Sequence, residues 1–125
     1  MALYQHWRDV PEDDWPWPNF IPSEIACRGT GELLVVPAAI DCLQRARDHS
    51  GRPFRISSGY RSRLHNAAVG GAPRSSHKLG IAFDISFRRH DKDELIESCR
   101  AAGFTGFGLS YKTFLHVDTG RSRQW

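Results

Sequence analysis

Two short segments, far apart in the sequence, constrain this chain more than any other feature. Residues 75–84 read Ser-Ser-His-Lys-Leu-Gly-Ile-Ala-Phe-Asp, and residues 114–118 read Phe-Leu-His-Val-Asp. The second segment alternates apolar and polar side chains, a pattern that predicts a β-strand with His116 and Asp118 on the same face. The first segment runs into an apolar stretch that predicts another strand, with Asp84 pointing away from its apolar neighbours. If the two strands are neighbours, their polar side chains can meet.

The polar side chains of these segments are those of a metal site. Neighbouring strands would bring His77, Asp84 and His116 together, and two imidazoles with one carboxylate suit a borderline metal such as zinc. Three protein ligands leave the fourth tetrahedral position open, as in catalytic zinc sites. We therefore predict one zinc ion bound by these three residues, and the hydrolase chemistry that such a site supports.

The spacing around the first two ligands matches a longer pattern. Ser75, His77, Gly80, Ala82 and Asp84 spell S-x-H-x-x-G-x-A-x-D, and an H-x-D element follows downstream. This combination resembles the zinc D-alanyl-D-alanine peptidases, which share a fold with the lysostaphin-type enzymes and the Hedgehog signalling domain. The resemblance implies a fold of the Hedgehog/DD-peptidase type.

The resemblance extends over roughly residues 20–125. Residues 57–62, Ser-Ser-Gly-Tyr-Arg-Ser, and the glycine-rich residues 69–73 look like the family's sequence upstream of the first zinc ligand. The ending, residues 114–125, is similar to the branch that contains periplasmic murein endopeptidases and phage-associated wall hydrolases. Such enzymes act on peptidoglycan, so the resemblance implies a cell-wall hydrolase.

The resemblance also implies roles for individual residues. It implies that His77, Asp84 and His116 bind the zinc ion. It further implies that Arg61 and Ser75 contact the carboxylate or the scissile carbonyl of the substrate. The implied substrates are peptidoglycan stem peptides or cross-links that contain D-amino acids, cut by an endopeptidase or a D,D-carboxypeptidase.

The sequence offers two candidates for the general base of the reaction. Many members of the family carry Glu or Asp three residues before the second zinc histidine, where this chain has Thr113, whose hydroxyl does not ionise near neutral pH. Asp118 would serve either as the base or as a group that orients His116. His65 would serve as the base or as a loop histidine bonded to backbone. Thr113 also keeps an alternative open, a catalytically inactive Hedgehog-like zinc module that binds peptidoglycan or a protein partner.

Composition is that of one small domain. The chain has 125 residues, enough to bury a core without disulfides, and its three cysteines lack metal-type spacing, which favours free buried thiols. The formal net charge of +3 favours approach to acidic polymers such as the cell wall. The arginines are dispersed and match no nucleic-acid motif, so we expect no nucleic-acid partner. We expect a monomer.

The N-terminal sequence bears on where the protein acts. Its first residues lack the basic start and apolar run of a signal peptide, and no stretch is long enough to span a membrane. We therefore expect synthesis in the cytoplasm without a leader. The protein would reach the cell wall or periplasm through lysis or in a phage particle, as a phage-type endolysin does.

Residues 1–22 predict an extended arm before the zinc peptidase domain of residues 23–125. This arm is rich in proline, tryptophan and acidic residues. Trp15 and Trp17 would either stack on sugar rings or attach the arm to its own domain.

The remaining patterns predict the fold class. Residues 37–49 and 91–102 have helical periodicity and are each followed by glycine, the usual helix stop. Short strands are expected over residues 54–58, 81–87, 104–109 and 113–118. We therefore predict a single α+β domain, with a small, mainly antiparallel sheet that carries the zinc site on one face and helices on the other.

Overall fold

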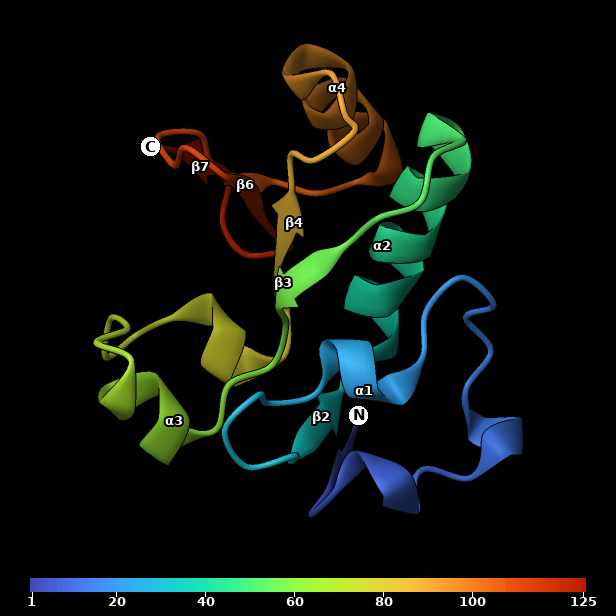
Figure 1. Ribbon diagram of the computed structural model, residues 1–125, viewed down its shortest axis with the longest axis vertical. Helices are drawn as coiled ribbons and strands as arrows, with labels where there is room; N and C mark the ends of the chain where they lie inside the picture. Colours follow the sequence, from blue (N-terminus) through green and yellow to red (C-terminus); the bar gives the residue numbers. More distant parts are fainter.

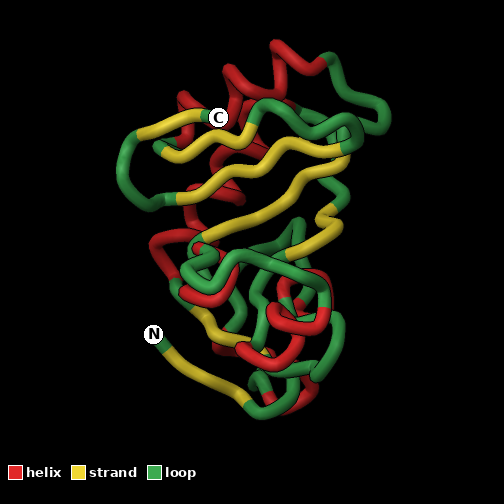
Figure 2. Tube along the Cα trace, turned by 90° about the vertical axis from the view of Figure 1, so that its left-hand side faces the viewer, coloured by secondary structure: helices red, strands yellow, loops and turns green.

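A five-stranded sheet forms the frame of the protein in the computed structural model, which describes residues 1–125. The strands lie in the order β3 (Ile56–Ser58), β4 (Ala82–Ser86), β6 (Phe114–Asp118), β5 (Gly106–Gly108) and β7 (Arg123–Gln124). Every pair is antiparallel except β5 and β7. Figure 2 shows the strands side by side in one half of the molecule, with the N-terminal segments gathered in the other half. The predicted mainly antiparallel sheet is confirmed.

The register of the two central strands sorts their side chains by polarity. Asp84 on β4 lies opposite His116 on β6, and Ala82 lies opposite Asp118. Opposite residues of an antiparallel pair point to the same face, so these polar groups share one side of the sheet. The other side carries buried apolar residues of the core, Phe83, Ile85, Leu115 and Val117.

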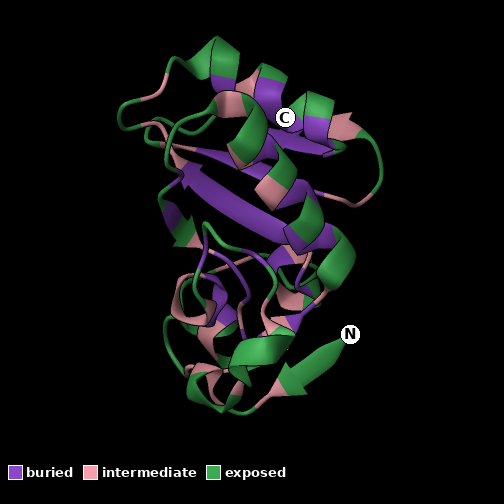
Figure 3. Ribbon diagram, turned by 90° about the vertical axis from the view of Figure 1, so that its right-hand side faces the viewer, coloured by how far each residue is buried: buried purple, intermediate pink, exposed green.

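Two helices cover the apolar side of the sheet. Helix α2 (Pro37–Ser50) begins with proline, and Gly51 ends it in the left-handed conformation. Helix α4 (Lys92–Ala102) is capped by the Asp91 side chain, which accepts a hydrogen bond from the Glu94 amide. Figure 3 shows both helices with exposed residues outward and buried strands beneath them. These are the two predicted helices, each shifted by about one residue.

The N-terminal arm is folded rather than simply extended. It contains β1 (Ala2–Tyr4), η1 (Trp7–Asp9) and η2 (Glu12–Asp14), and β1 forms a two-stranded antiparallel sheet with β2 (Leu33–Val35). Trp17 is buried, and its Nε1 donates a hydrogen bond to Asp41 on α2. The prediction of an extended arm missed this structure because the partners of the arm lie far along the chain.

Trp17 attaches this arm to the rest of the protein, and Trp15 bonds within the arm. The Trp15 Nε1 donates to the Phe20 carbonyl, and the Trp17 Nε1 to the Asp41 carboxylate, each at 2.8 Å. Both indole N–H groups are therefore engaged within the chain, which favours attachment over sugar stacking. The domain boundary at residue 22 stays a prediction.

The segments between β3 and β4 border the polar side of the sheet. They contain α3 (Arg63–Ala68) and η3 (Ser76–Leu79), while α1 (Pro22–Ile25) precedes β2. Figure 1 shows α3 on the opposite side of β3 and β4 from α2. No helix is both long and apolar enough to cross a bilayer. The single α+β domain that the sequence predicts is thus the observed fold.

Candidate metal site

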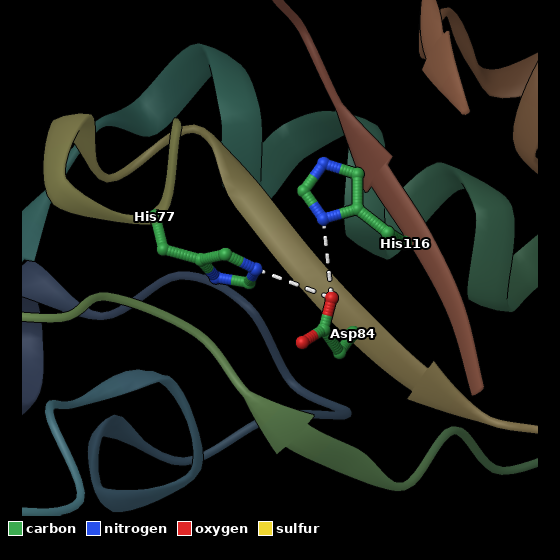
Figure 4. A group of neighbouring side chains, drawn as sticks. All are labelled: His77, Asp84 and His116. Carbon is green, nitrogen blue, oxygen red and sulfur yellow. Dashed lines mark hydrogen bonds and ion pairs between the residues drawn. The ribbon is translucent and has the colours of Figure 1, made fainter. Parts of the chain in front are cut away.

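Three side chains from three different elements meet on the polar side of the sheet. His77 comes from η3, Asp84 from β4 and His116 from β6. Asp84 Oδ1 lies 3.2 Å from His77 Nε2 and 3.2 Å from His116 Nδ1. All three side chains are buried, and each offers one ligand atom within 4.8 Å of the others. Figure 4 shows the two imidazoles converging on the carboxylate. The structure thus brings together the three residues that the sequence predicts as zinc ligands.

The outward nitrogen of each imidazole is engaged elsewhere. His77 Nδ1 lies 2.7 Å from the Gly59 carbonyl oxygen, and His116 Nε2 lies 2.7 Å from Asp118 Oδ2. Both partners are acceptors, so in a neutral imidazole these outward nitrogens carry the hydrogen. The nitrogens that face Asp84 then present lone pairs. Three lone pairs converge on one point, which is the donor arrangement that a cation such as zinc satisfies.

The pKa values of Asp84 and His116 are both shifted by their close contact. Burial raises the pKa of the Asp84 carboxyl, but its close interactions with the His116 and His77 rings outweigh burial and lower the pKa to about 2. Burial lowers the pKa of His116, yet its bonds to Asp118 and Asp84 raise the pKa above its ordinary value. Asp84 is therefore an anionic ligand at neutral pH. The carboxylates on both sides of His116 favour its protonated form, so a metal that binds its Nδ1 would displace a proton.

Asp118 lies behind His116, on the side away from the other two ligands. Its side chain has no exposed surface. Although burial raises its pKa, hydrogen bonds with His116 and Arg123 hold the pKa of this carboxyl far below its ordinary range. The carboxylate accepts hydrogen bonds from His116, from both terminal nitrogens of Arg123, from the Gly120 amide and from the Ser76 hydroxyl.

This geometry distinguishes between the two roles considered for Asp118. A general base must reach the proton that it removes, and it must be able to accept that proton. Asp118 contacts the outward nitrogen of His116 and is already neutralised by Arg123. The structure therefore favours an orienting role for Asp118 and disfavours its use as the base.

Two glycines of β5 make room for this buried network. Gly108 lies opposite His116, and Gly106 lies opposite Asp118. A Cβ on Gly108 would come within 2.9 Å of His116 Cβ, and one on Gly106 would overlap Asp118 Oδ1 and lie 2.5 Å from Arg123 Nη1. Sequence reasoning missed these positions. The signal was the Gly-Phe-Gly stretch within a predicted strand, because glycine in a strand often marks a close approach.

The C-terminal residues form an aromatic wall beside the ligands, made of Tyr111, Phe114 and Trp125. The Trp125 ring lies 5.0 Å from that of His116, and its Nε1 donates to the Tyr111 hydroxyl at 3.2 Å. Tyr111 in turn stacks on Phe114 at 4.5 Å. Because β7 pairs with β5, the end of the chain returns to the metal site. The sequence did not predict this strand.

Arg61, for which a substrate contact is predicted, lines the pocket over the ligands. Its Nη2 is 3.6 Å from Asp84 Oδ2, its Nε donates to the Ser58 hydroxyl and its Nη1 donates to Asn66 Oδ1. The guanidinium is thus held at the edge of the ligand set. Ser75 also lines the pocket, and its hydroxyl accepts a hydrogen bond from the His77 amide.

His65 and Thr113 lie outside the pocket that opens over the ligands. The His65 ring packs over Gly29, where an added Cβ would overlap it. It lies there because α3 turns this side chain toward the segment before β2. His65 is therefore not placed to act as a base at this site. Thr113 is exposed, and only its carbonyl makes a bond, from the Phe87 amide.

The lining of the pocket has one acidic side chain, that of Asp84. The rest consists of the two histidines, the aromatic wall, three arginines, and small residues between Gly70 and Ser76. No carboxylate other than a metal ligand is therefore available at the pocket surface as a base.

Comparison with known proteins agrees with the arrangement of these ligands. The family described as Peptidase M15 matches residues 18–118, which include all three. No individual curated protein matches the chain.

Proposed function

Because this chain belongs to the peptidase M15 family, we propose that it is a zinc-dependent peptidase acting on peptidoglycan stem peptides or cross-links that contain D-amino acids. The family supports metallopeptidase chemistry, whereas zinc and the wall peptide are our assignment. The observation that carries the assignment is the convergence of His77 Nε2, Asp84 Oδ1 and His116 Nδ1 on one point. These donors suit zinc, and their number leaves a position free for chemistry.

The residues of the pocket divide the work of hydrolysis. A zinc ion bound by the three ligands would polarise the scissile carbonyl and increase the acidity of water. Arg61 supplies positive charge beside the reacting carbonyl, where negative charge develops in the transition state. Asp118 holds the His116 ring in the tautomer whose Nδ1 faces the metal position. Ser75 contacts the peptide from the loop that carries His77.

A second candidate function is favoured by the composition of the pocket lining. With Thr113 exposed and Asp118 paired with Arg123, no free carboxylate faces the metal position. A protein without a base would bind peptidoglycan or a protein partner through its zinc site and would not hydrolyse it. We rank this non-catalytic zinc module second because the chain belongs to a peptidase family, and a bound metal would by itself lower the pKa of water.

We propose the bacterial cell wall as the place of action, reached during lysis or from a phage particle. The formal net charge of +3 supports this assignment, because cell walls carry carboxylates and attached polyanions.

One digestion experiment tests the proposed function. Zinc-loaded protein, a chelator-treated sample and the variant His77→Ala would be incubated with purified peptidoglycan of several cross-link chemistries. Mass spectrometry would then identify the released muropeptides. Products that require both zinc and His77 are expected, and their masses reveal the bond that is cut. A protein that holds zinc, sediments with peptidoglycan and releases nothing would be the non-catalytic module.

A further inference from the structure

The pocket over the metal site carries more positive charge than its own acids neutralise. Three arginines line it, Arg61, Arg74 and Arg123, against the single carboxylate of Asp84. Arg123 is paired with the buried Asp118 at 2.9 Å, and Arg61 lies 3.6 Å from Asp84. The third guanidinium has no acidic partner, and a bound divalent metal would add further positive charge. Such a pocket favours a substrate that carries negative charge.

Arg74 is the pocket arginine that has no acidic partner. It is exposed at the pocket, and its side chain makes no hydrogen bond or ion pair within the chain. Arg61 differs, because its guanidinium donates to Ser58 and Asn66 and lies next to Asp84. The donor fork of Arg74 is therefore free to bind an anionic group that enters the pocket.

The segment that carries Arg74 is held in place from both sides. Asn66 is only 2% exposed, and its Nδ2 donates to the Ala72 carbonyl at 2.9 Å. The ammonium of Lys78 donates to the Pro73 carbonyl. These bonds fix the backbone just before Arg74, so that only the side chain has to be ordered when a ligand binds.

We propose that Arg74 is a specificity-determining residue that binds a carboxylate of the peptide substrate, so that stem peptides with this group free are preferred over amidated ones. The inference rests on the proposed peptidase function. A guanidinium binds a carboxylate through two parallel N–H···O bonds. A carboxamide offers one acceptor oxygen and no charge, and its NH2 group faces the guanidinium donors unfavourably. Apart from the C-terminal carboxylate, two residues of stem peptides bear such a group that can be amidated, D-glutamate and diaminopimelate.

Kinetics with matched peptides tests the role of Arg74. Stem peptides would be prepared with both carboxylates free, with only the D-glutamate amidated, or with only the diaminopimelate amidated. For the wild type, amidation of the recognised group should raise KM roughly three- to tenfold, the range for a partly exposed charged contact. Arg74→Gln should raise KM by a similar factor for the free peptide and should not respond to amidation. In both cases kcat should change little.

A matched variant and a binding measurement complete the design. Arg63→Gln removes the same charge from an exposed arginine of α3 that does not line the pocket, and it should leave KM and the response to amidation unchanged. Isothermal titration calorimetry of the same peptides with metal-free protein measures the contact independently of turnover. Arg74→Gln should weaken binding there by the same factor, and Arg74→Lys should recover part of it.

The outcomes separate this inference from the proposed function. Suppose that zinc-dependent hydrolysis occurs, but that Arg74→Gln raises KM equally for free and amidated peptides or leaves it unchanged. Arg74 then does not bind a carboxylate of the substrate, although the peptidase proposal stands. If the zinc-loaded protein hydrolyses no peptide, the peptidase proposal fails. Calorimetry then still decides whether Arg74 binds the carboxylate.

Discussion

The pocket over the metal site has a strand side and a loop side, and they hold their side chains by different means. On the strand side, Asp84 and His116 project from the paired central strands, with Asp118 fully buried behind them. On the loop side, His77 and Arg61 come from segments outside the sheet and are fixed by individual hydrogen bonds. The first arrangement is a continuous buried network, whereas the second is a set of separate anchors.

This contrast indicates a division of labour. The spacing of the strand-side ligands follows from the register of β4 and β6. A substitution in these strands therefore shifts the ligands, either through the hydrogen bonds between the strands or through Asp118. A loop-side anchor can be removed with local consequences. We therefore expect strand-side variants to change metal affinity and loop-side variants to change substrate affinity, with His77, a ligand on the loop side, as the exception.

The largest effect is expected from the ligands themselves. His116→Ala and His77→Ala each leave two ligands, so both variants should lose stoichiometric zinc and all metal-dependent hydrolysis. Plasma mass spectrometry of the purified proteins measures the zinc, and circular dichroism controls for the fold. A variant that retained one zinc per chain would show that the altered histidine is not a ligand.

Asp118→Asn should have the next largest effect. It removes the charge that pairs with Arg123 and weakens the bond that orients His116, so zinc affinity should fall by about 10- to 100-fold. The free energy of unfolding should fall by about 1 to 3 kcal/mol, less than for a fully buried pair because Arg123 is partly exposed. Chelator competition and thermal denaturation measure the two effects.

Asp41→Asn is the matched control for this experiment, since Asp41 also accepts a side-chain hydrogen bond, from Trp17, but lies away from the pocket. It should leave zinc affinity unchanged. Equal zinc affinity in the Asp118 and Asp41 variants would contradict the orienting role of Asp118.

Gly106→Ala tests the strand side without replacing a polar side chain. The added methyl overlaps Asp118 Oδ1 and crowds Arg123. Such overpacking lowers the free energy of unfolding by about 1 to 3 kcal/mol, because neighbouring groups must shift to make room. We expect a lower midpoint of thermal unfolding and a several-fold loss of zinc affinity. Gly120→Ala is the graded control, because its Cβ would lie 3.1 Å from the same oxygen and small movements can relieve that contact. If both variants bound zinc like the wild type, the glycines of β5 would not be required.

The smallest effect on the metal is expected from Asn66→Ala, on the loop side. Asn66 accepts a hydrogen bond from Arg61 and donates one to the Ala72 carbonyl. Its loss should raise KM several-fold with zinc still stoichiometric, and losing the bond to the Ala72 carbonyl, which water can replace because Ala72 is exposed, should cost about 0.5 to 1.5 kcal/mol of stability. A fall in zinc content as large as that of Asp118→Asn would remove the distinction between the two sides.

Local patterns predicted most of the elements. The alternation of residues 114–118 corresponds to β6, and the apolar run of residues 81–87 corresponds to β4. Both long helices begin and end within about one residue of their predicted bounds. The arm of residues 1–22 was the clearest error. Its structure depends on contacts between Trp17 and α2 and between β1 and β2, which no local pattern reveals.

The metal ligands could be proposed from the amino-acid pattern alone, because the chemistry of two imidazoles and a carboxylate is a local property, as is the strand alternation that directs Asp84 and His116 to one face. The roles of their neighbours could not. Which nitrogen of His116 faces Asp84, and hence whether Asp118 acts as a base or orients the ring, depends on Arg123 from another strand. The need for glycine at position 106 and the distance of His65 from the pocket likewise became visible only in three dimensions. The physical reason is that register and packing are set by the whole core: a shift of β6 by one residue would turn His116 and Asp118 to the other face.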